Sequence, residues 1–151
     1  MEIKLALFLP RDAASVPVTR QMLDNCLDTL GVAPDTRNDI ALALSEACAN
    51  VIQHAGPGFE YEVRVRAMDG RCVIEVENTS GIPLALANAG EPVPPTAEHG
   101  RGLSIIDAVA DNLWLTGNGG KGITTVHFEK DLEYRPGAPG AVLLTLEDEA
   151  D

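Results

Sequence analysis

The sequence predicts an α+β fold, a two-layer sandwich in which helices pack on one face of a mixed, mostly antiparallel sheet. Three observations support this prediction. The periodic segments follow the order strand, helix, helix, strand, strand, and after a long loop helix, strand, strand. Two of the strands are joined by a tight Asp-Gly turn, which makes an antiparallel hairpin. The 151 residues contain no internal repeat, so a single core is expected.

The first strand is predicted over residues 3–9, where aliphatic side chains occupy every second position. Pro10 ends it, because proline cannot donate a hydrogen bond to a neighbouring strand. We expect Ser15 to cap a helix that continues with helical apolar spacing to about Leu30. Gly31 is expected to end this helix, since glycine readily takes the left-handed conformation common after helix ends.

A second helix is predicted over residues 34–55, which carry an apolar stripe at helical spacing. Two strands with strict alternation follow at 61–67 and 72–76. The residues between them include Asp69 and Gly70, one of the strongest short signals for a β-hairpin. This part of the chain therefore predicts a long helix followed by an antiparallel strand pair.

A proline-rich stretch, about 81–99, shows no periodicity, and a loop of this length in a compact domain usually has a function. A short helix is predicted to begin at Gly100 after this loop. Two further strands are predicted at 113–115 and 123–129, the second after a glycine-rich turn.

The last segment differs from the rest in composition. We expect one domain over residues 1–131, followed by an acidic tail over 132–151 that contains a Pro- and Gly-rich stretch. Within the tail, the apolar run at 142–146 is expected to add an edge strand to the sheet. The acidic residues after it are expected to be solvated.

The charge of the chain limits the classes of partner. It carries 11 Lys and Arg against 23 Asp and Glu, a net charge of −12. Nucleic acids and acidic membranes both require a basic surface, so neither is an expected partner. Cys26, Cys48 and Cys72 lie in apolar runs, where buried reduced thiols are expected. No apolar run approaches the ~18 residues of a membrane span, and we expect a cytoplasmic protein.

The second predicted helix carries a polar stripe. Glu46, Asn50 and His54 recur every four residues and therefore lie on one side of the helix. An exposed helix face is the ordinary explanation of such a stripe. Here, however, its neighbours are Ala43 and Ala47, and these small side chains would leave room for a ligand against the helix. A carboxylate one turn from a carboxamide can hold a water or a metal ion between them.

A second candidate is Gly100-Arg101-Gly102-Leu103, which precedes the short helix. Glycines allow backbone N–H groups to approach a phosphate, and a helix N-terminus adds partial positive charge. A simple turn is the alternative, and the segment lacks the Gly-Lys-Ser/Thr of a Walker loop.

A third candidate pairs two strand residues. Strand parity places Thr124 on the face of Val126, and Asn78 on the face of Val76, so both can point into the helix-covered layer. Capping of strand ends is the alternative explanation. Trp114 is expected in the core or an interface.

Taken in order, these segments resemble the Bergerat-type (GHKL) ATP-binding fold, and most closely the small bacterial anti-sigma factors that are also serine protein kinases. The resemblance spans roughly residues 5–130. Residues 45–55, Ser-Glu-Ala-Cys-Ala-Asn-Val-Ile-Gln-His-Ala, resemble the N-box of the family. Residues 99–103, His-Gly-Arg-Gly-Leu, and the run of glycines that leads to Thr124-Thr125-Val126 resemble two further family motifs.

The resemblance implies roles for individual residues. Asn50 would bind a Mg²⁺ ion that bridges the phosphates of ATP, and Glu46 would act as general base or position the attacking hydroxyl. Residues 82–99 would form a lid over the ATP, and Thr124 would hydrogen-bond near the adenine. The residues implied to contact the nucleotide are Asn50, His54, Asn78, Gly81, Gly100, Arg101, Gly102, Leu103 and Thr124.

The resemblance also implies protein partners. They are a sigma factor and an anti-sigma factor antagonist of the STAS type, which would be phosphorylated on serine. A homodimer through the first strand and helix is implied as well.

The sequence departs from the family at the adenine-reading motif, Asp-x-Gly-x-Gly. Here the segment reads Asn78-Thr79-Ser80-Gly81-Ile82, so a neutral amide replaces the carboxylate and a serine replaces the first glycine. Loss of the charge would cost about 1–2 kcal/mol, or about tenfold in affinity. Three hypotheses therefore stand: an active kinase, a non-catalytic regulator with weak or lost ATP binding, and an unrelated α+β domain or a detached histidine-kinase catalytic domain.

Overall fold

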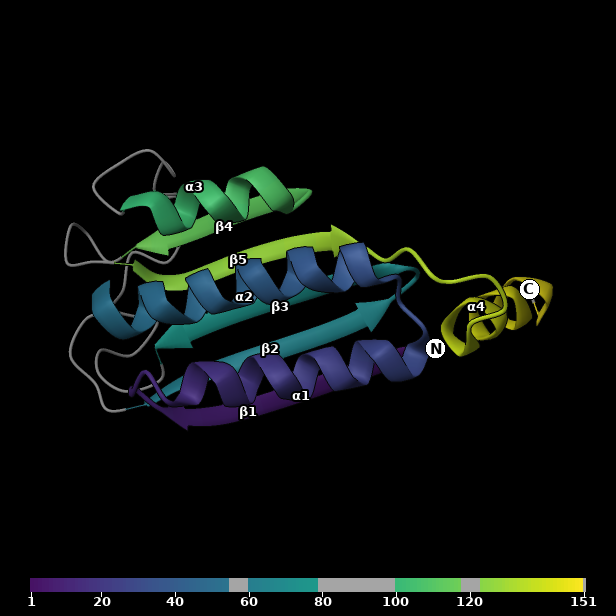
Figure 1. The fold of residues 1–151 in the computed structure, drawn as a ribbon, viewed down its shortest axis with the longest axis horizontal. Helices are drawn as coiled ribbons and strands as arrows, with labels where there is room; N and C mark the ends of the chain where they lie inside the picture. The colour runs from purple at the N-terminus through teal and green to yellow at the C-terminus, as the bar shows by residue number, and fades with distance from the viewer. Residues whose placement is uncertain (55–59, 79–99, 118–122, 151) are drawn as a thin grey trace.

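A computed structural model describes residues 1–54, 60–78, 100–117 and 123–150. Five strands form one sheet in the order β1-β2-β3-β5-β4, and every neighbouring pair of these strands is antiparallel. Helices α1, α2 and α3 cover one face of the sheet, and α4 lies at one end of it (Figure 1). The predicted α+β sandwich is confirmed, with a sheet that is antiparallel rather than mixed across the described strands.

The N-terminal elements are β1 (Glu2–Pro10) and α1 (Ser15–Leu30). The aliphatic side chains of β1 are half-buried and its other side chains are exposed, as the alternation predicts. Gly31 ends α1 with a φ of 80°, also as predicted. The predicted cap at Ser15 is wrong, because Ala14 occupies the cap position without a side-chain hydrogen bond. The Ser15 hydroxyl is instead turned into the core, where it lies 2.5 Å from the Tyr61 hydroxyl.

The centre of the molecule is α2 (Pro34–His54), which packs over β3 (Arg71–Asn78), the second strand of a hairpin with β2 (Glu60–Met68). The turn contains Asp69 and Gly70 with φ of 54° and 74°, which confirms the predicted hairpin. Alternate side chains of both strands point toward the helices and are buried, as period-2 patterning requires.

The remaining core elements are α3 (Gly100–Val109), β4 (Asn112–Gly117) and β5 (Ile123–Asp131). Leu103 and Ile106 of α3 are fully buried, and Val126 and Phe128 of β5 are buried below the helices. Trp114 is 48% exposed on β4, which leaves the interface, rather than the core, of the two places expected for it.

The tail forms a helix, α4 (Pro139–Ala150), so the expected edge strand at 142–146 is wrong. A short apolar run fits either structure, and here Pro139 begins a helix, a position that proline favours. Before the helix, the tail is held to the domain by backbone bonds. The Ala33 N–H donates to the Glu133 carbonyl over 2.7 Å, and the Arg135 N–H donates to the Gly31 carbonyl over 2.8 Å.

The structure also tests the expected burial of the cysteines and the expectation about membrane spans. Cys48 and Cys72 are buried, and burial raises the pKa of each thiol to about 12. Cys26 is only half-buried, so the expectation of full burial is wrong there. Among the helices that the structure describes, none is long and apolar enough to cross a bilayer.

Candidate functional site

The polar stripe of α2 lies at the candidate site, and its central residue is buried. Asn50 is only 5% exposed, and its Oδ1 atom meets no hydrogen-bond donor within the described part of the chain. A buried carbonyl oxygen without a donor is rare in folded proteins, because leaving it unsatisfied costs about 1–3 kcal/mol. The atom therefore has the free lone pairs that a cation or a ligand donor requires.

The small neighbours of the stripe have a different role from the one predicted. Ala43 and Ala47 are 1% and 0% exposed and belong to the core. The room left by these alanines is thus filled by packed protein and does not admit a ligand. Glu46, between them in sequence, is half-buried.

The first turn of α3 meets the stripe at Glu46. A Cβ atom placed on Gly102 would lie 2.8 Å from Glu46 Oε2, closer than such atoms approach in real structures. The structure therefore brings together two sequence motifs that are more than fifty residues apart. Glycine at position 102 leaves the space that the carboxylate occupies, and a larger residue there would displace it. Leu103, the next residue, has its side chain fully buried, so only its backbone could face a nucleotide.

The sheet contributes Asn78, the last residue of β3. Cys72, Ile74 and Val76 on the same strand are fully buried under the helices, which confirms the predicted parity. Asn78 follows them on that face and is half-buried. Its carboxamide is thus placed to reach the helix-covered layer from the sheet, as predicted from the sequence.

Several predicted site residues are described in part or lie outside the described residues. Gly100 is the first residue of α3. For His54 in α2, Arg101 in α3 and Thr124 in β5, the structure describes the backbone but not the side chains. Gly81 and the predicted lid at 82–99 lie outside the described residues.

Comparison with known proteins places the chain in a family. The family described as "Histidine kinase-like ATPase domain" matches residues 9–128, from the end of β1 to β5. The chain belongs to this family. The resemblance drawn from the N-box and glycine motifs is thereby confirmed, and both motifs fall inside the matched range.

Relatives of this histidine kinase-like ATPase domain include serine-protein kinases RsbW from Bacillus cereus (strain B4264), Bacillus anthracis and Bacillus thuringiensis (strain Al Hakam). Each is 24% identical over 123 residues, which cover 74% of this chain and 76% of the relative. The fold also matches the crystal structure of the RsbU and RsbW domains of Rv1364c from Mycobacterium tuberculosis, with a TM-score of 0.62 and 20% identity. That match covers 86% of this chain and 32% of the longer Mycobacterium chain.

Sequence reasoning missed a residue that holds the end of the N-box helix in this ATPase domain. Arg11, in the loop between β1 and α1, donates from Nη2 to the Ile52 carbonyl over 3.0 Å. Ile52 lies in the last turn of α2, where carbonyl groups lack partners within the helix. The arginine thus fixes the helix two residues from Asn50. No periodicity signals it, because it lies in a short irregular loop.

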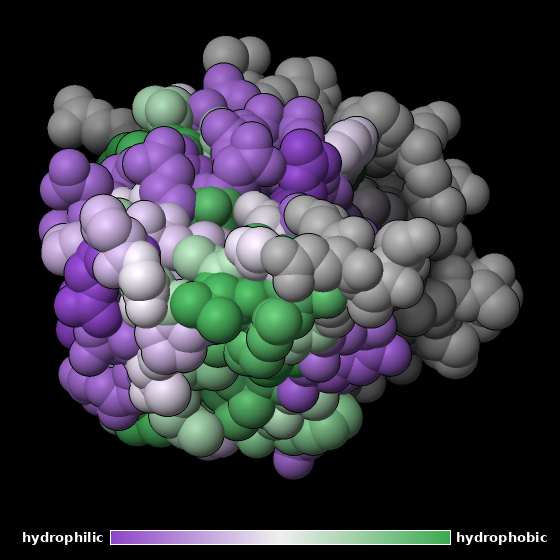
Figure 2. Space-filling model, turned by 90° about the vertical axis from the view of Figure 1, so that its right-hand side faces the viewer, coloured by the Kyte–Doolittle hydropathy of each residue, from purple (hydrophilic) through white to green (hydrophobic). Residues whose placement is uncertain are grey.

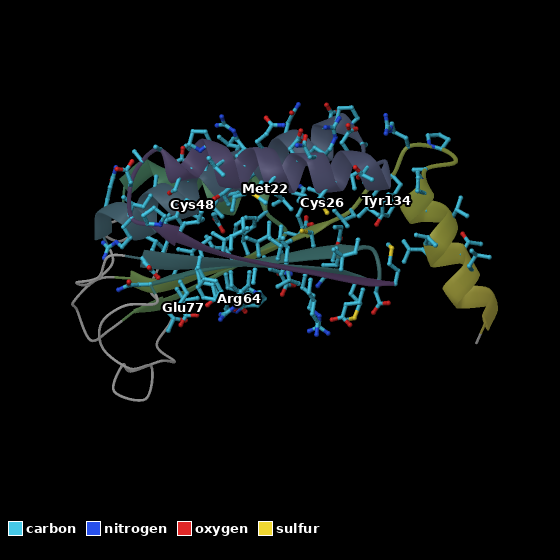
Figure 3. All side chains as sticks on the ribbon, turned by 90° about the horizontal axis from the view of Figure 1, so that it is seen from below. Met22, Cys26, Cys48, Arg64, Glu77 and Tyr134 are labelled. Atoms are coloured by element: carbon cyan, nitrogen blue, oxygen red, sulfur yellow. The ribbon has the colours of Figure 1, made fainter. Side chains whose placement is uncertain are left out.

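A polar cluster on the opposite face of the sheet was also missed. Figure 3 shows Arg64 and Glu77 on the side of the sheet away from Cys48 and Met22. Arg64 Nη2 lies 2.8 Å from Glu77 Oε2, and a hollow of about 610 Å³ lies nearby between β1, β2, β3 and β5. The lining residues all belong to strands, so this hollow is separate from the candidate site between α2 and α3.

Two carboxylates of this cluster flank His127. Its Nδ1 lies 2.9 Å from Glu75 Oε1, and its Nε2 lies 3.0 Å from Glu129 Oε2. The hydrogen bond with His127 holds the pKa of Glu129 below its ordinary value. Burial raises the pKa of Glu75, but its contacts with Arg64 and His127 outweigh burial and lower it overall. These contacts hold the ring of His127 between two carboxylates on the open face of the sheet.

Proposed function

We propose that this chain is an anti-sigma factor with serine protein kinase activity, which transfers the γ-phosphoryl group of ATP to an antagonist protein. One observation supports the proposal above all others. Asn50 presents a buried oxygen that meets no donor in the described part of the chain, one helical turn from the carboxylate of Glu46 and on the helix that meets α3. A carboxamide oxygen is a hard ligand of the kind that Mg²⁺ accepts, so the residue fits a magnesium nucleotide.

The proposed reaction needs little covalent help from the protein. When bound, Mg-ATP supplies the phosphoryl group and the cation that neutralises its charge. Asn50 would hold the cation through Oδ1, and Glu46 would orient the attacking serine hydroxyl or accept its proton. The N-terminal turn of α3, which begins at Gly100, offers backbone N–H groups to the phosphates. Such local donors suit a chain whose net charge of −12 would otherwise repel a polyanion.

The partners follow from the relatives named as serine-protein kinases and from the family resemblance. We infer a sigma factor and a STAS-type antagonist as protein partners, in the cytoplasm, with the nucleotide site carried by residues 1–131. A homodimer through β1 and α1 belongs to the same proposal. Gly81, His54 and Thr124 are proposed to complete the nucleotide contacts.

Two variants test the proposal. Isothermal titration calorimetry with Mg-ATP should show binding by the natural chain and at least about tenfold weaker binding by Asn50→Ala, since a metal ligand is lost. Glu46→Gln should retain the affinity but lose transfer of labelled phosphate to serine of the cognate antagonist. Binding by the Asn50→Ala variant equal to that of the natural chain would disprove the role of Asn50.

A non-catalytic regulator is the second candidate function, and the neutral side chain of Asn78 favours it. An amide accepts the bond from an adenine amino group more weakly than a carboxylate does. Under this alternative, calorimetric titration of the natural chain with Mg-ATP gives no heat of binding. Asn78→Asp restores binding, because the rest of the pocket is intact. Micromolar binding by the natural chain that Asn50→Ala removes would refute the alternative.

A further inference from the structure

The C-terminal helix α4 presents apolar side chains to solvent. Val142, Leu143 and Leu146 are 48%, 40% and 55% exposed. Residues three and four positions apart lie on one side of a helix, so the three side chains form one surface, here called the α4 face. Figure 2 views the end of the molecule at which α4 lies and shows apolar surface gathered at its centre, with polar surface beside and above it.

The first part of α4 is well anchored to the domain. A Cβ on Gly140 would lie 2.2 Å from the Tyr134 ring, so the helix begins in close contact with that side chain. Ala138 packs equally closely against Gly31, and Leu144 lies near Gly70 of the hairpin. The anchored side of the helix is thus opposed by protein, whereas the described residues leave the α4 face about half exposed. A helix of 12 residues is marginally stable on its own, so a partner on the exposed face would stabilise it.

Charge indicates what kind of partner this is. The tail from residue 132 to 151 carries five carboxylates and one arginine, and Glu147, Asp148 and Glu149 directly follow the α4 face in sequence. Nearby basic side chains are already in ion pairs. Arg71 Nε lies 3.1 Å from Asp131, and Arg135 Nη2 lies 3.6 Å from Asp28. A partner that covers the apolar side chains would therefore gain from carrying positive charge beside them.

A second copy of the chain would not satisfy these requirements. Two copies, each with a net charge of −12, would bring their acidic tails together. The α4 face also offers only three side chains, whereas a stable protein interface uses about 20–30 residues on each side. A short segment of another protein needs far less area.

We propose that the α4 face docks a basic amphipathic helix of a partner protein. The apolar side of that helix covers Val142, Leu143 and Leu146, and its Lys and Arg side chains complement the acidic sequence 147–149 that follows. The surface lies beyond residues 9–128 that match the ATPase family, at the opposite end of the sandwich from the start of α3 (Figure 1). The proposal therefore goes beyond the kinase function and does not depend on it.

The test uses the full chain and a labelled synthetic peptide as probe, a helix with leucine on one side and lysine on the other. Fluorescence anisotropy should show binding that weakens as salt is raised, because charge pairs near the surface are screened. A matched peptide with the same leucines and with glutamate in place of lysine should bind at least about tenfold more weakly. Equal binding of both peptides would overturn the proposal.

Three variants locate the site. The double variant Leu143→Ser/Leu146→Ser should weaken binding of the basic peptide at least about tenfold. Glu147→Gln/Asp148→Gln/Glu149→Gln should weaken it and reduce its salt dependence, even if the serine variant were to unfold α4. The control Phe8→Ser, which removes an apolar side chain from β1 that is more exposed than those of the α4 face, should bind the peptide as the natural chain does.

Two outcomes contradict the proposal directly. One is unchanged peptide binding by both the serine and the glutamine variants, which would place the peptide elsewhere on this acidic chain. The other is a dimer of the natural chain in sedimentation equilibrium that Leu143→Ser/Leu146→Ser converts to a monomer. That result would show that a second copy covers the α4 face.

Discussion

Two side chains of α2, Asn50 and Glu46, decide the chemistry of the candidate site. The surroundings of each come from other parts of the chain. Asn50 is buried, and its Oδ1 atom meets no hydrogen-bond donor among the described residues. Glu46 keeps its place because position 102 lacks a side chain. The sequence indicates both α2 residues by their spacing, but it could not show that Gly102 makes room for a carboxylate.

The first prediction concerns Gly102→Ala. The added methyl group should displace the Glu46 carboxylate, which is the end of a flexible side chain and can move at little cost. Alanine also favours a helix over glycine by about 1 kcal/mol, so the free energy of unfolding should be unchanged or higher. Phosphoryl transfer should fall at least about tenfold, since the oriented carboxylate is lost.

Gly140→Ala is the matched control. Its methyl group would meet the rigid ring of Tyr134, so this variant should unfold at lower urea concentration while phosphoryl transfer at low temperature is retained. A Gly102→Ala variant that loses stability but keeps its activity would contradict the role given to Glu46.

At the scale of elements, a buried hydroxyl network joins α1 and β2. The Ser15 hydroxyl lies 2.5 Å from that of Tyr61, and the Thr19 hydroxyl donates to the Ser15 carbonyl over 3.0 Å. Tyr61 is fully buried, and burial raises its pKa to about 12. The network fixes the first turn of α1 against the sheet, which explains why Ser15 points inward and does not cap the helix.

The second prediction is a double-mutant cycle on this network. Tyr61→Phe and Ser15→Ala should each lower the free energy of unfolding by about 1–2 kcal/mol, because each leaves a buried partner without its hydrogen bond. Removing both should cost less than the sum of the two, since no orphaned group then remains. Urea denaturation measures all four proteins. Strict additivity would show that the two hydroxyls do not interact.

The third prediction concerns the carboxylates on the open face of the sheet. The folded-state pKa of Glu129 lies below its ordinary value, so its ionised form stabilises the folded chain above the ordinary pKa of about 4.3. This stabilisation is lost as the pH falls through the lower folded-state pKa. Glu129→Gln should therefore lower the free energy of unfolding near neutral pH, and the difference from the natural chain should shrink in acid.

Urea denaturation at several pH values measures this effect. Glu133→Gln, at an exposed carboxylate of the tail, is the control and should leave the pH dependence unchanged. A loss of stability in Glu129→Gln that is equal at neutral and acid pH would show that the Glu129–His127 contact makes no ionic contribution.

At the scale of the whole molecule, the two proposed sites lie at opposite ends. The candidate nucleotide site lies where α2 ends and α3 begins, and the α4 face lies at the other end (Figure 1). The part of the tail before α4 is bonded to the domain through Glu133 and Arg135. A domain boundary placed after Ala138 therefore separates the two proposed sites and keeps these backbone bonds within the domain.

The fourth prediction is that a chain ending at Ala138 keeps its nucleotide site. It retains the bonds of Glu133 and Arg135 to the domain and the packing of Ala138 on Gly31. Its affinity for Mg-ATP in calorimetry should lie within about twofold of that of the full chain, a difference of about 0.4 kcal/mol. Binding of the basic peptide should be lost. A chain ending at Ala138 that folds but no longer binds Mg-ATP would show that α4 takes part in the nucleotide site.

The sequence by itself determined the α+β class, the hairpin at Asp69 and Gly70, the end of α1 at Gly31 and the polar stripe of α2. These features depend on local patterning and backbone freedom, which a single segment carries. The tertiary structure alone decided that 142–146 is helical, that Ser15 faces the core and that Gly102 accommodates Glu46. Each of these features depends on the residues that pack against it, and those residues are distant in the sequence.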